Sequence, residues 1–558
     1  MLLWNLYFLT VLGLSHIGKA SFEPLANLAL LALVFVFYVL HFVKPRLSTA
    51  LQILTGTPLA VALLLHQLGL ILSKELLTQI QNLLGLNPHY LLELLRRSVP
   101  AQYLWAALAT YIVLRIVNRY IRVHAWVATA VALFALHTLW ADHLVEKRNA
   151  KLALMENANS KTLRAGGFET ERIVLGETRF EQLKITFNQG TNTAGKQSVQ
   201  GMVTTYFEKQ RKLALDTFTP LAQPDFDIVL IHVCSLAWAD LKGMRQTQHP
   251  LLRDADLLFS EFNTATSYSG PAVVRLLRST CGQPTHTDLY TPPRAECALF
   301  NQLERAGFRV EFGLNHDGKF DGFKQQVQTN LMVPAQEPVT FDSVSLGAIA
   351  FDQSPIARDL DFLKAWLKHR NTESGKPVAY YYNTITLHDG NLLPNSSLNS
   401  LEAYPVRLER FLDDLQGFVQ AYRKSGRKAL VLMVPEHGAG MTGEYGQLTG
   451  LREIPTPAIT KAPVLGYWIS PNFERKDVYK FPVTIEKPVS YLAVSEFIAR
   501  WIELPPSQRD DPTWPLLVSD LPTSLYVAEQ GRIAVTEING NYLLKTPGAR
   551  QWVPLDKQ

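Results

Sequence analysis

The sequence predicts an α/β protein with an N-terminal membrane domain, and two observations carry this prediction. Residues 1–145 are strongly apolar, whereas residues 226–558 alternate short apolar runs with amphipathic segments of helical period. Buried apolar strands between amphipathic helices are typical of an α/β domain with a mostly parallel central sheet. The chain has 558 residues, which is enough for more than one domain at about 100–200 residues each. We therefore expect a transmembrane domain over 1–145, a linker over 146–225 and an α/β domain over 226–558.

Five apolar stretches in the first domain predict five membrane-spanning helices. A helix needs about 20 apolar residues to cross a bilayer core, within a usual range of 17–25. The second, third and fifth stretches meet this length well, and the first and fourth are shorter. The first stretch lacks a basic leader and a small-residue cleavage site, which indicates an anchor and not a removable signal peptide. The stretches cover residues 3–18, 22–43, 51–73, 102–118 and 123–141.

Residues 74–101, between the third and fourth stretches, mix apolar with charged and amide side chains. This spacing predicts a helix that lies along the membrane surface instead of a sixth span.

Charge and cysteine content limit the compartment and the partners. The net charge of +5 is small for this length and evenly spread, so nothing indicates a nucleic-acid partner. Lysines and arginines near the apolar stretches do not decide the orientation of the membrane domain. Cys281 and Cys297 are close in sequence and could form a disulfide in an oxidising compartment, the alternative being two free thiols in a reducing cytosol. With the disulfide, an odd number of spans and the amino end inside, we expect residues 146–558 to lie outside the cytoplasmic membrane.

Local patterns place several elements of the soluble part. Apolar residues along one edge of an otherwise polar segment predict a helix over 203–215. Apolar residues that recur every three and four positions predict another helix over 408–422. Gly426 follows as a helix C-cap. Residues 524–553 read as short strands, and Asn539-Gly540 is typical of a hairpin turn.

Four side chains with ligand chemistry occur where predicted strands end or a predicted helix begins. Cys234 follows one apolar run, Glu436 and His437 follow another, and Ser269 precedes a helical pattern. Ligands of open α/β sheets sit beyond the carboxyl ends of strands. A thiol, a carboxylate, an imidazole and a hydroxyl are ligand types that hold zinc beside a nucleophile.

Each of these motifs also has a purely structural explanation. Ser269 before Gly270-Pro271 is a common start of a helix, and Cys234 alone is more often a small buried apolar residue than a ligand. The combination favours a metal site, in an α/β order that can bring the motifs together. A hydroxyl at a helix N-terminus beside a metal ion loses its proton more easily and can attack phosphorus or sulfur.

Other polar residues are candidates with open alternatives. His388 could transfer a proton to a leaving group or simply cap a surface turn. Arg452 could bind phosphate oxygens in a bidentate way or form a surface ion pair. Tyr268 could orient a substrate or belong to the core, and His316 most resembles part of a turn.

Five phrases of the sequence resemble the membrane phosphoethanolamine transferases of the alkaline-phosphatase superfamily. Those proteins combine five spans with a periplasmic zinc domain that has a Ser or Thr nucleophile. The superfamily usually has an acidic ligand after the first strand and Asp-His-Gly after a later one. Here Cys234 and Glu436 stand at those two positions, as in the transferases of bacterial cellulose synthesis systems. The phrases are residues 234–238, 266–272, 386–391, 434–438 and 450–455.

The resemblance implies a site, a cofactor and a reaction. It implies that one zinc ion is held by Cys234, Ser269, Glu436 and His437, that Ser269 is the nucleophile, and that Tyr268, His388 and Arg452 line the site. The implied reaction moves phosphoethanolamine from phosphatidylethanolamine to glucosyl hydroxyls of nascent cellulose through a phosphoserine intermediate. No histidine follows His437, so a second metal ion is not expected.

The same resemblance implies a location and partners. The chain would be a multi-pass protein of the bacterial inner membrane, with an alkaline-phosphatase-like catalytic domain in the periplasm. Its partners would be the donor lipid, the cellulose glucan and subunits of a cellulose synthase complex.

Three alternatives to this function remain open at this point. The acceptor could be lipid A or another glycan. A sulfatase or phosphodiesterase is less favoured, because the run Ser269-Gly270-Pro271-Ala272-Val273 has the proline of the sulfatase signature but lacks its arginine. The chain could also be a membrane subunit that docks a synthase complex and has no catalytic activity.

Overall fold

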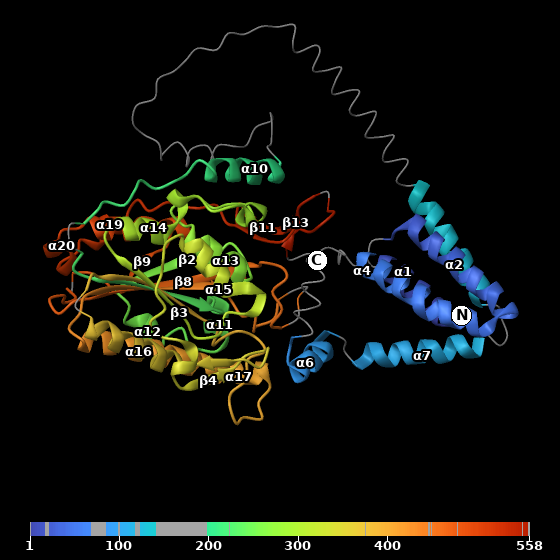
Figure 1. Cartoon of the computed structure of the whole chain (residues 1–558). Helices are drawn as coiled ribbons and strands as arrows, with labels where there is room; N and C mark the ends of the chain where they lie inside the picture. The colour runs from blue at the N-terminus through green and yellow to red at the C-terminus, as the bar shows by residue number, and fades with distance from the viewer. Residues whose placement is uncertain are drawn as a thin grey trace, which may run out of the picture. The chain divides into compact units, whose positions relative to one another are not determined.

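The computed structural model describes residues 2–16, 22–67, 85–98, 101–117, 123–140, 198–221 and 224–555, the last range without 374, 445, 446, 448, 477 and 550. Contacts divide the chain into two compact units, residues 1–81 with 99–196 and residues 82–98 with 197–558 (Figure 1). Most of the predicted linker, up to residue 197, lies outside the described residues.

The first unit consists of apolar helices, which confirms the predicted character of the N-terminal domain. They are α1 (Leu2–His16), α2 (Pro24–Val43), the continuous α3 (Pro45–Leu51), η1 (Gln52–Gly56) and α4 (Thr57–Gln67), then α7 (Ala101–Val117) and a helix over Val123–Trp140. Among the described residues, Pro24–Val43, Pro45–Leu64 and Val123–Trp140 are long and apolar enough to cross a membrane. The helices α1 and α7 have 15 and 17 residues, so five spans stay a prediction.

The second unit is built around a seven-stranded sheet with the order β3-β6-β1-β7-β8-β2-β9. Of these strands only β8 is antiparallel to its neighbours. This arrangement confirms the predicted α/β class with a mostly parallel sheet. The strands are β1 (Asp227–Cys234), β2 (Leu257–Asn263), β3 (Arg309–Leu314), β6 (Val378–Thr384), β7 (Ala429–His437), β8 (Lys461–Ile469) and β9 (Val483–Ile485).

Helices cover both faces of this sheet and enclose two apolar cores (Figure 1). Ile228 and Leu230 of β1 face one core, and Val229 and Ile231 face the other, as the two-residue period of a strand requires. The first core includes residues of α13 (Ser269–Leu277), α14 (Leu299–Arg305), α15 (Phe323–Leu331) and α19 (Tyr491–Glu503). The second includes residues of α16 (Asp359–Thr372) and α17 (Ser400–Lys424).

Short elements complete the second unit. They are α11 (Trp238–Gly243), α12 (Pro250–Arg253), α18 (Pro457–Thr460), α20 (Pro506–Asp510) and α21 (Trp514–Val518), with a two-stranded sheet of β4 (Leu346–Ile349) and β5 (Pro355–Ala357). Cys281 and Cys297 form the predicted disulfide after α13.

Two helix boundaries differ from the prediction for identifiable reasons. The helix predicted over 203–215 is α10 (Val199–Gln210), because the side chain of Ser198 caps it by accepting from the Gly201 N–H. The helix predicted over 408–422 is α17, which begins eight residues earlier, at Ser400. Asn399 and Glu402 form a capping box at that end, which satisfies N–H groups that would otherwise lack partners.

The C-terminal segment forms a small antiparallel sheet of β10 (Val527–Gln530), β11 (Ile533–Ile538), β12 (Asn541–Lys545) and β13 (Val553–Pro554). Asn539 and Gly540 connect β11 to β12 with φ angles of 51° and 77°. Two successive positive φ angles are the mark of a type I′ turn, so the predicted hairpin is confirmed.

A helix from the N-terminal part of the sequence belongs to the second unit. Residues 85–98, which include α6 (Pro88–Ser98), contact the α/β domain, and the Asn87 N–H donates to the Phe351 carbonyl at 2.9 Å. The surface helix predicted over 74–101 is described only in this part, and its contact with a membrane stays a prediction.

Candidate metal centre

The candidate ligands come from two neighbouring strands and one helix. β1 and β7 pair in parallel, and their register places Cys234 opposite His437. Both residues are therefore at the carboxyl edge of the sheet, together with Glu436. β7 continues to His437, so the Glu436-His437 motif forms the last two residues of the strand and not a turn after it. Ser269 is the first residue of α13.

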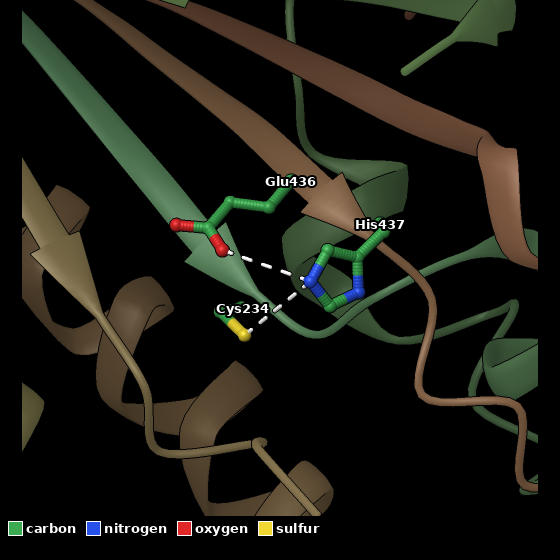
Figure 2. Close-up of side chains that lie close together, drawn as sticks. All are labelled: Cys234, Glu436 and His437. Carbon is green, nitrogen blue, oxygen red and sulfur yellow. Dashed lines mark hydrogen bonds and ion pairs between the residues drawn. The ribbon is translucent and has the colours of Figure 1, made fainter. Parts of the chain in front are cut away.

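The ligand atoms of Cys234, Glu436 and His437 lie within 4.8 Å of one another (Figure 2). The Nε2 atom of His437 is 3.8 Å from Cys234 Sγ and 3.8 Å from Glu436 Oε2. Ser269 Oγ is 3.3 Å from Cys234 Sγ and 3.4 Å from His437 Nε2. A tetrahedral zinc ion with bonds of about 2.0–2.3 Å holds its ligand atoms roughly 3.3–3.8 Å apart. The four distances given above therefore match one tetrahedral ion, and a Glu436 oxygen lies within 4.8 Å of Cys234 Sγ.

Unpaired polar atoms support this interpretation. Glu436 Oε2 is buried and has no hydrogen-bond partner among the described residues, although buried polar atoms normally have one. His437 Nδ1 lies 2.9 Å from the carbonyl oxygen of Gly438. An N–H at Nδ1 that donates to this carbonyl leaves Nε2 with a free lone pair, the arrangement typical of a metal-binding histidine.

Burial disfavours the charged forms of the three ionisable ligands. It raises the pKa of Cys234 to about 12, raises the pKa of Glu436 and lowers the pKa of His437 well below its usual value. A divalent cation would reverse this preference for the thiol and the carboxyl, because it stabilises their charged forms. Binding of the ion is therefore expected to release protons.

Polar residues behind the ligands hold Glu436 in place. Asn383 Nδ2 donates to Glu436 Oε1 at 2.6 Å, and Asn383 Oδ1 lies 3.1 Å from His316 Nε2. His232 Nδ1 is 3.6 Å from the same carboxylate oxygen. The sequence placed His316 in a turn and did not indicate Asn383 or His232. The register between β1 and β6 explains why these residues meet, since it pairs His232 with Asn383.

Arg452 and Tyr268 lie against each other at the site. The guanidinium carbon of Arg452 is 5.7 Å from the centroid of the Tyr268 ring, and Tyr268 Oη donates to Glu453 Oε1 at 2.5 Å. Arg452 is buried, and its Nε and Nη1 atoms have no hydrogen-bond partner among the described residues. Burial lowers the pKa of Arg452, but the interactions with neighbouring acidic groups, of which Cys234 and Tyr268 are the largest, outweigh burial and leave it raised. A buried, unpaired guanidinium is suited to bind phosphate oxygens.

His388 is neutral at the site and its backbone is firmly held. Burial and, secondly, the charge of Arg452 lower the pKa of His388 to about 3. The carbonyl oxygen of His388 accepts a hydrogen bond of 3.0 Å from Arg407 Nη1. So low a pKa keeps the imidazole neutral and makes it a weak base.

Tyr90 of α6 contacts Asp389, the residue next to His388, and no sequence pattern predicts this contact. Tyr90 Oη donates to Asp389 Oδ2 at 2.8 Å, across 299 positions of the chain. Ser400 Oγ, at the start of α17, lies 3.2 Å from Asp389 Oδ1 and 3.0 Å from Glu93 Oε1 of α6, so its one O–H can donate to either carboxylate. Gly390 leaves room for the Tyr90 ring, since a Cβ there would lie 2.7 Å from it.

Comparison with known proteins then settles the family. The model of the cellulose biosynthesis protein BcsG C-terminal domain matches residues 186–552, and that of the BcsG N-terminal domain matches residues 4–137. This chain belongs to the BcsG family. It is 31% identical over 560 residues to BcsG of Salmonella typhimurium and 30% identical over 556 residues to BcsG of Escherichia coli, with 99% of this chain and 95% of the relative covered in each case.

Solved structures with a similar arrangement were also found. One is a protein in the alkaline phosphatase superfamily from Vibrio parahaemolyticus, with a TM-score of 0.44, 13% identity, and 63% of this chain and 87% of that chain covered. Another is the C-terminal periplasmic domain of EcEptC from Escherichia coli, with a TM-score of 0.42, 12% identity, and 62% and 96% covered.

Of the residues that the sequence singled out, the structure brings Cys234, Ser269, Glu436 and His437 to one point. Arg452 lies beside Tyr268, and its charge acts on both His388 and His437.

Proposed function

We propose that this BcsG family member is a zinc-dependent phosphoethanolamine transferase that modifies nascent cellulose. The observation that carries the proposal is the position of Ser269 Oγ, which lies within 3.4 Å of Cys234 Sγ and His437 Nε2. At that position the hydroxyl could bind the same metal ion as the thiol, the carboxylate and the imidazole. It also stands at the N-terminus of the nine-residue helix α13, whose dipole favours negative charge.

One zinc ion would be held by Cys234, Glu436, His437 and Ser269. When bound, it would lower the pKa of the Ser269 hydroxyl and offset negative charge on phosphoryl oxygens. The other steps follow from the side chains of the site.

The first half-reaction transfers the headgroup to the protein. Ser269 Oγ attacks the phosphorus of phosphatidylethanolamine and forms an Oγ–P bond, while the P–O bond to diacylglycerol breaks. The proton of Ser269 goes to the diacylglycerol oxygen. The unpaired N–H groups of Arg452 can bind the phosphoryl oxygens during this step, and Tyr268 supports the Arg452 side chain.

The second half-reaction transfers the group to the acceptor. A glucosyl hydroxyl of cellulose attacks the phosphorus, the new O–P bond forms and the Oγ–P bond breaks. The proton of the attacking hydroxyl passes to the Oγ atom of Ser269 as the Oγ–P bond breaks. His388 is neutral because burial and Arg452 lower its pKa, which leaves it a weak base, so the direct transfer to Ser269 carries this step.

The family supports the choice of acceptor and of compartment. Both relatives named above are cellulose biosynthesis proteins, so the acceptor would be the glucan, and subunits of a cellulose synthase complex would be partners. The apolar N-terminal helices would hold the catalytic unit beside the donor lipid. We place the protein in the bacterial inner membrane, as a multi-pass protein, with the catalytic unit in the periplasm.

Mass spectrometry of the full-length protein incubated with phosphatidylethanolamine tests this proposal. The expected result is a phosphoethanolamine adduct on Ser269, and a Ser269→Ala variant is the matched control. A protein that forms no adduct would favour a non-catalytic membrane subunit. Analysis of the products of cells with and without the gene separates the two acceptors. If cells without the gene lack phosphoethanolamine on lipid A and still carry it on cellulose, cellulose is excluded as the acceptor.

A further inference from the structure

A small cavity lies between the last turn of α13, the start of α19 and residues 522–524. Its volume is about 20 Å³, and a cavity needs at least about 10–15 Å³ to hold one water molecule. The cavity is therefore large enough for a water molecule or a monoatomic ion. Arg275, Arg278, Gln283 and Tyr491 are among the residues that line it.

Arg275 presents one edge of its guanidinium without a partner. The residue is 2% exposed, and its Nη1 donates to the Pro284 carbonyl at 2.8 Å. Its Nε and Nη2 atoms are buried and have no hydrogen-bond partner among the described residues. The N–H groups of these two nitrogens are parallel and bind an anion in a bidentate way. In Arg370, which is equally buried, the same two nitrogens donate to Asp227 Oδ1 at 3.2 and 3.0 Å.

Tyr491, the first residue of α19, adds another unpaired donor to the cavity. The residue is 4% exposed, and its Oη atom is buried without a hydrogen-bond partner in the part of the chain that the structure describes. Buried polar groups normally have partners, and a phenol O–H can donate to an anion. Three unpaired donor atoms from two residues that line one cavity indicate that the cavity binds an acceptor.

Charge favours an anion over a water molecule. Arg275 and Arg278 line the cavity, and no aspartate or glutamate is among the described residues that line it. Burial lowers the pKa of Arg275, and the charge of Glu529 opposes this most strongly. However, Glu529 Oε2 accepts from the His286 N–H at 2.7 Å, and no carboxylate of the described residues is within 4.0 Å of Arg275.

A buried charge without a close counter-charge is costly. A water molecule would complete the hydrogen bonds of the cavity but would leave the charge of Arg275 uncompensated. A halide ion would do both.

We propose that this cavity binds one halide ion, normally chloride, held by Nε and Nη2 of Arg275 and by Oη of Tyr491. The ion would join α13, the helix that begins at Ser269, to the start of α19. Because the unfolded chain lacks this arrangement of donors, halide binding should stabilise the folded protein in proportion to the logarithm of the halide concentration above the dissociation constant. The proposal does not depend on the reaction that the protein catalyses.

Urea unfolding of the full-length protein in detergent tests the proposal, with sodium chloride or bromide replacing sodium gluconate at constant ionic strength. The unfolding midpoint of the wild type should rise with halide concentration, because gluconate is too large for the cavity. Arg275→Gln should lose this dependence. Tyr491→Phe keeps the guanidinium and loses one donor to a charged group, so it should need about tenfold more halide for the same shift.

Arg509→Gln is the matched control. Arg509 is also buried, but its Nη2 already donates to Asp225 Oδ1 at 2.7 Å. This variant should keep the halide dependence of the wild type, measured as the shift from its own midpoint in gluconate. If Arg275→Gln does not fold, the comparison of Tyr491→Phe with Arg509→Gln still decides the question.

Anomalous diffraction from crystals of the full-length protein grown in bromide locates the ion. The expected result is a bromine peak between Arg275 and Tyr491 that is absent from Arg275→Gln crystals. A water molecule at this position without an anomalous signal would overturn the proposal. So would a wild-type midpoint that does not change between gluconate and chloride, or equal halide shifts in the wild type, Arg275→Gln and Tyr491→Phe.

Discussion

Removal of the Asn383 side chain tests whether the residues behind the ligands contribute to the metal site. Asn383 Nδ2 donates to Glu436 Oε1 at 2.6 Å, and both residues are fully buried. An Asn383→Ala substitution would take away the donor that orients the carboxylate. Loss of such a partner typically weakens metal binding by about 10–100-fold, which corresponds to about 1.4–2.8 kcal/mol.

The assay is a competition titration of the full-length protein against a chromogenic zinc chelator. Asn330→Ala is the matched control, because Asn330 is also buried and hydrogen-bonded, with its partners Arg278 and Gln326. We expect the zinc dissociation constant to rise for Asn383→Ala and to stay unchanged for Asn330→Ala. An unchanged constant in a folded Asn383→Ala protein would refute the reasoning, as would equal losses in the two variants.

Three further predictions concern stability and catalysis. Burial lowers the pKa of His316 to about 4, below its unfolded value, so its contribution to stability is present above pH 6.5 and is lost as pH falls toward 4. Between pH 7 and 5 the wild type should lose about 2 kcal/mol of unfolding free energy through this group. Urea unfolding of His316→Gln should show a loss smaller by about that amount, and an identical pH dependence of the two proteins would contradict the assignment. Cys281→Ser combined with Cys297→Ser should lower the free energy of unfolding by about 3 kcal/mol, as for a loop of similar length, and an unchanged urea midpoint would argue against a structural disulfide. Tyr90→Phe keeps the ring but removes the hydroxyl that donates to Asp389, so turnover should fall while KM for the donor lipid stays unchanged. If the effects of Tyr90→Phe and Asp389→Asn add up in the double variant, the two residues act separately and the prediction is wrong.

The parts of the site that could be predicted are those with a local signal. Cys234 and the Glu436-His437 pair each follow an apolar run, and such a run followed by polar residues shows where a buried strand ends. Ser269 precedes Gly270-Pro271 and a helical pattern, which indicates a helix start. The α/β class followed from the same alternation of strands and helices.

The site residues that the sequence did not indicate are brought together by segments that lie far apart in the chain. Asn383 and His232 meet at Glu436 because β6, β1 and β7 are adjacent, and no local pattern fixes the order of strands. Tyr90 reaches Asp389 across 299 positions, from a segment whose amphipathic pattern fits a membrane surface as well as a protein surface. The apolar periodicity does not show where α10 and α17 begin, because the caps at Ser198 and Asn399 lie outside it.

X-ray absorption at the zinc edge of the purified full-length protein tests the central claim most directly. The account predicts about one zinc per chain with a single sulfur ligand near 2.3 Å and nitrogen or oxygen ligands near 2.0–2.2 Å, and loss of the sulfur signal in Cys234→Ser. A folded protein that holds no zinc, or zinc without a sulfur ligand, would contradict it.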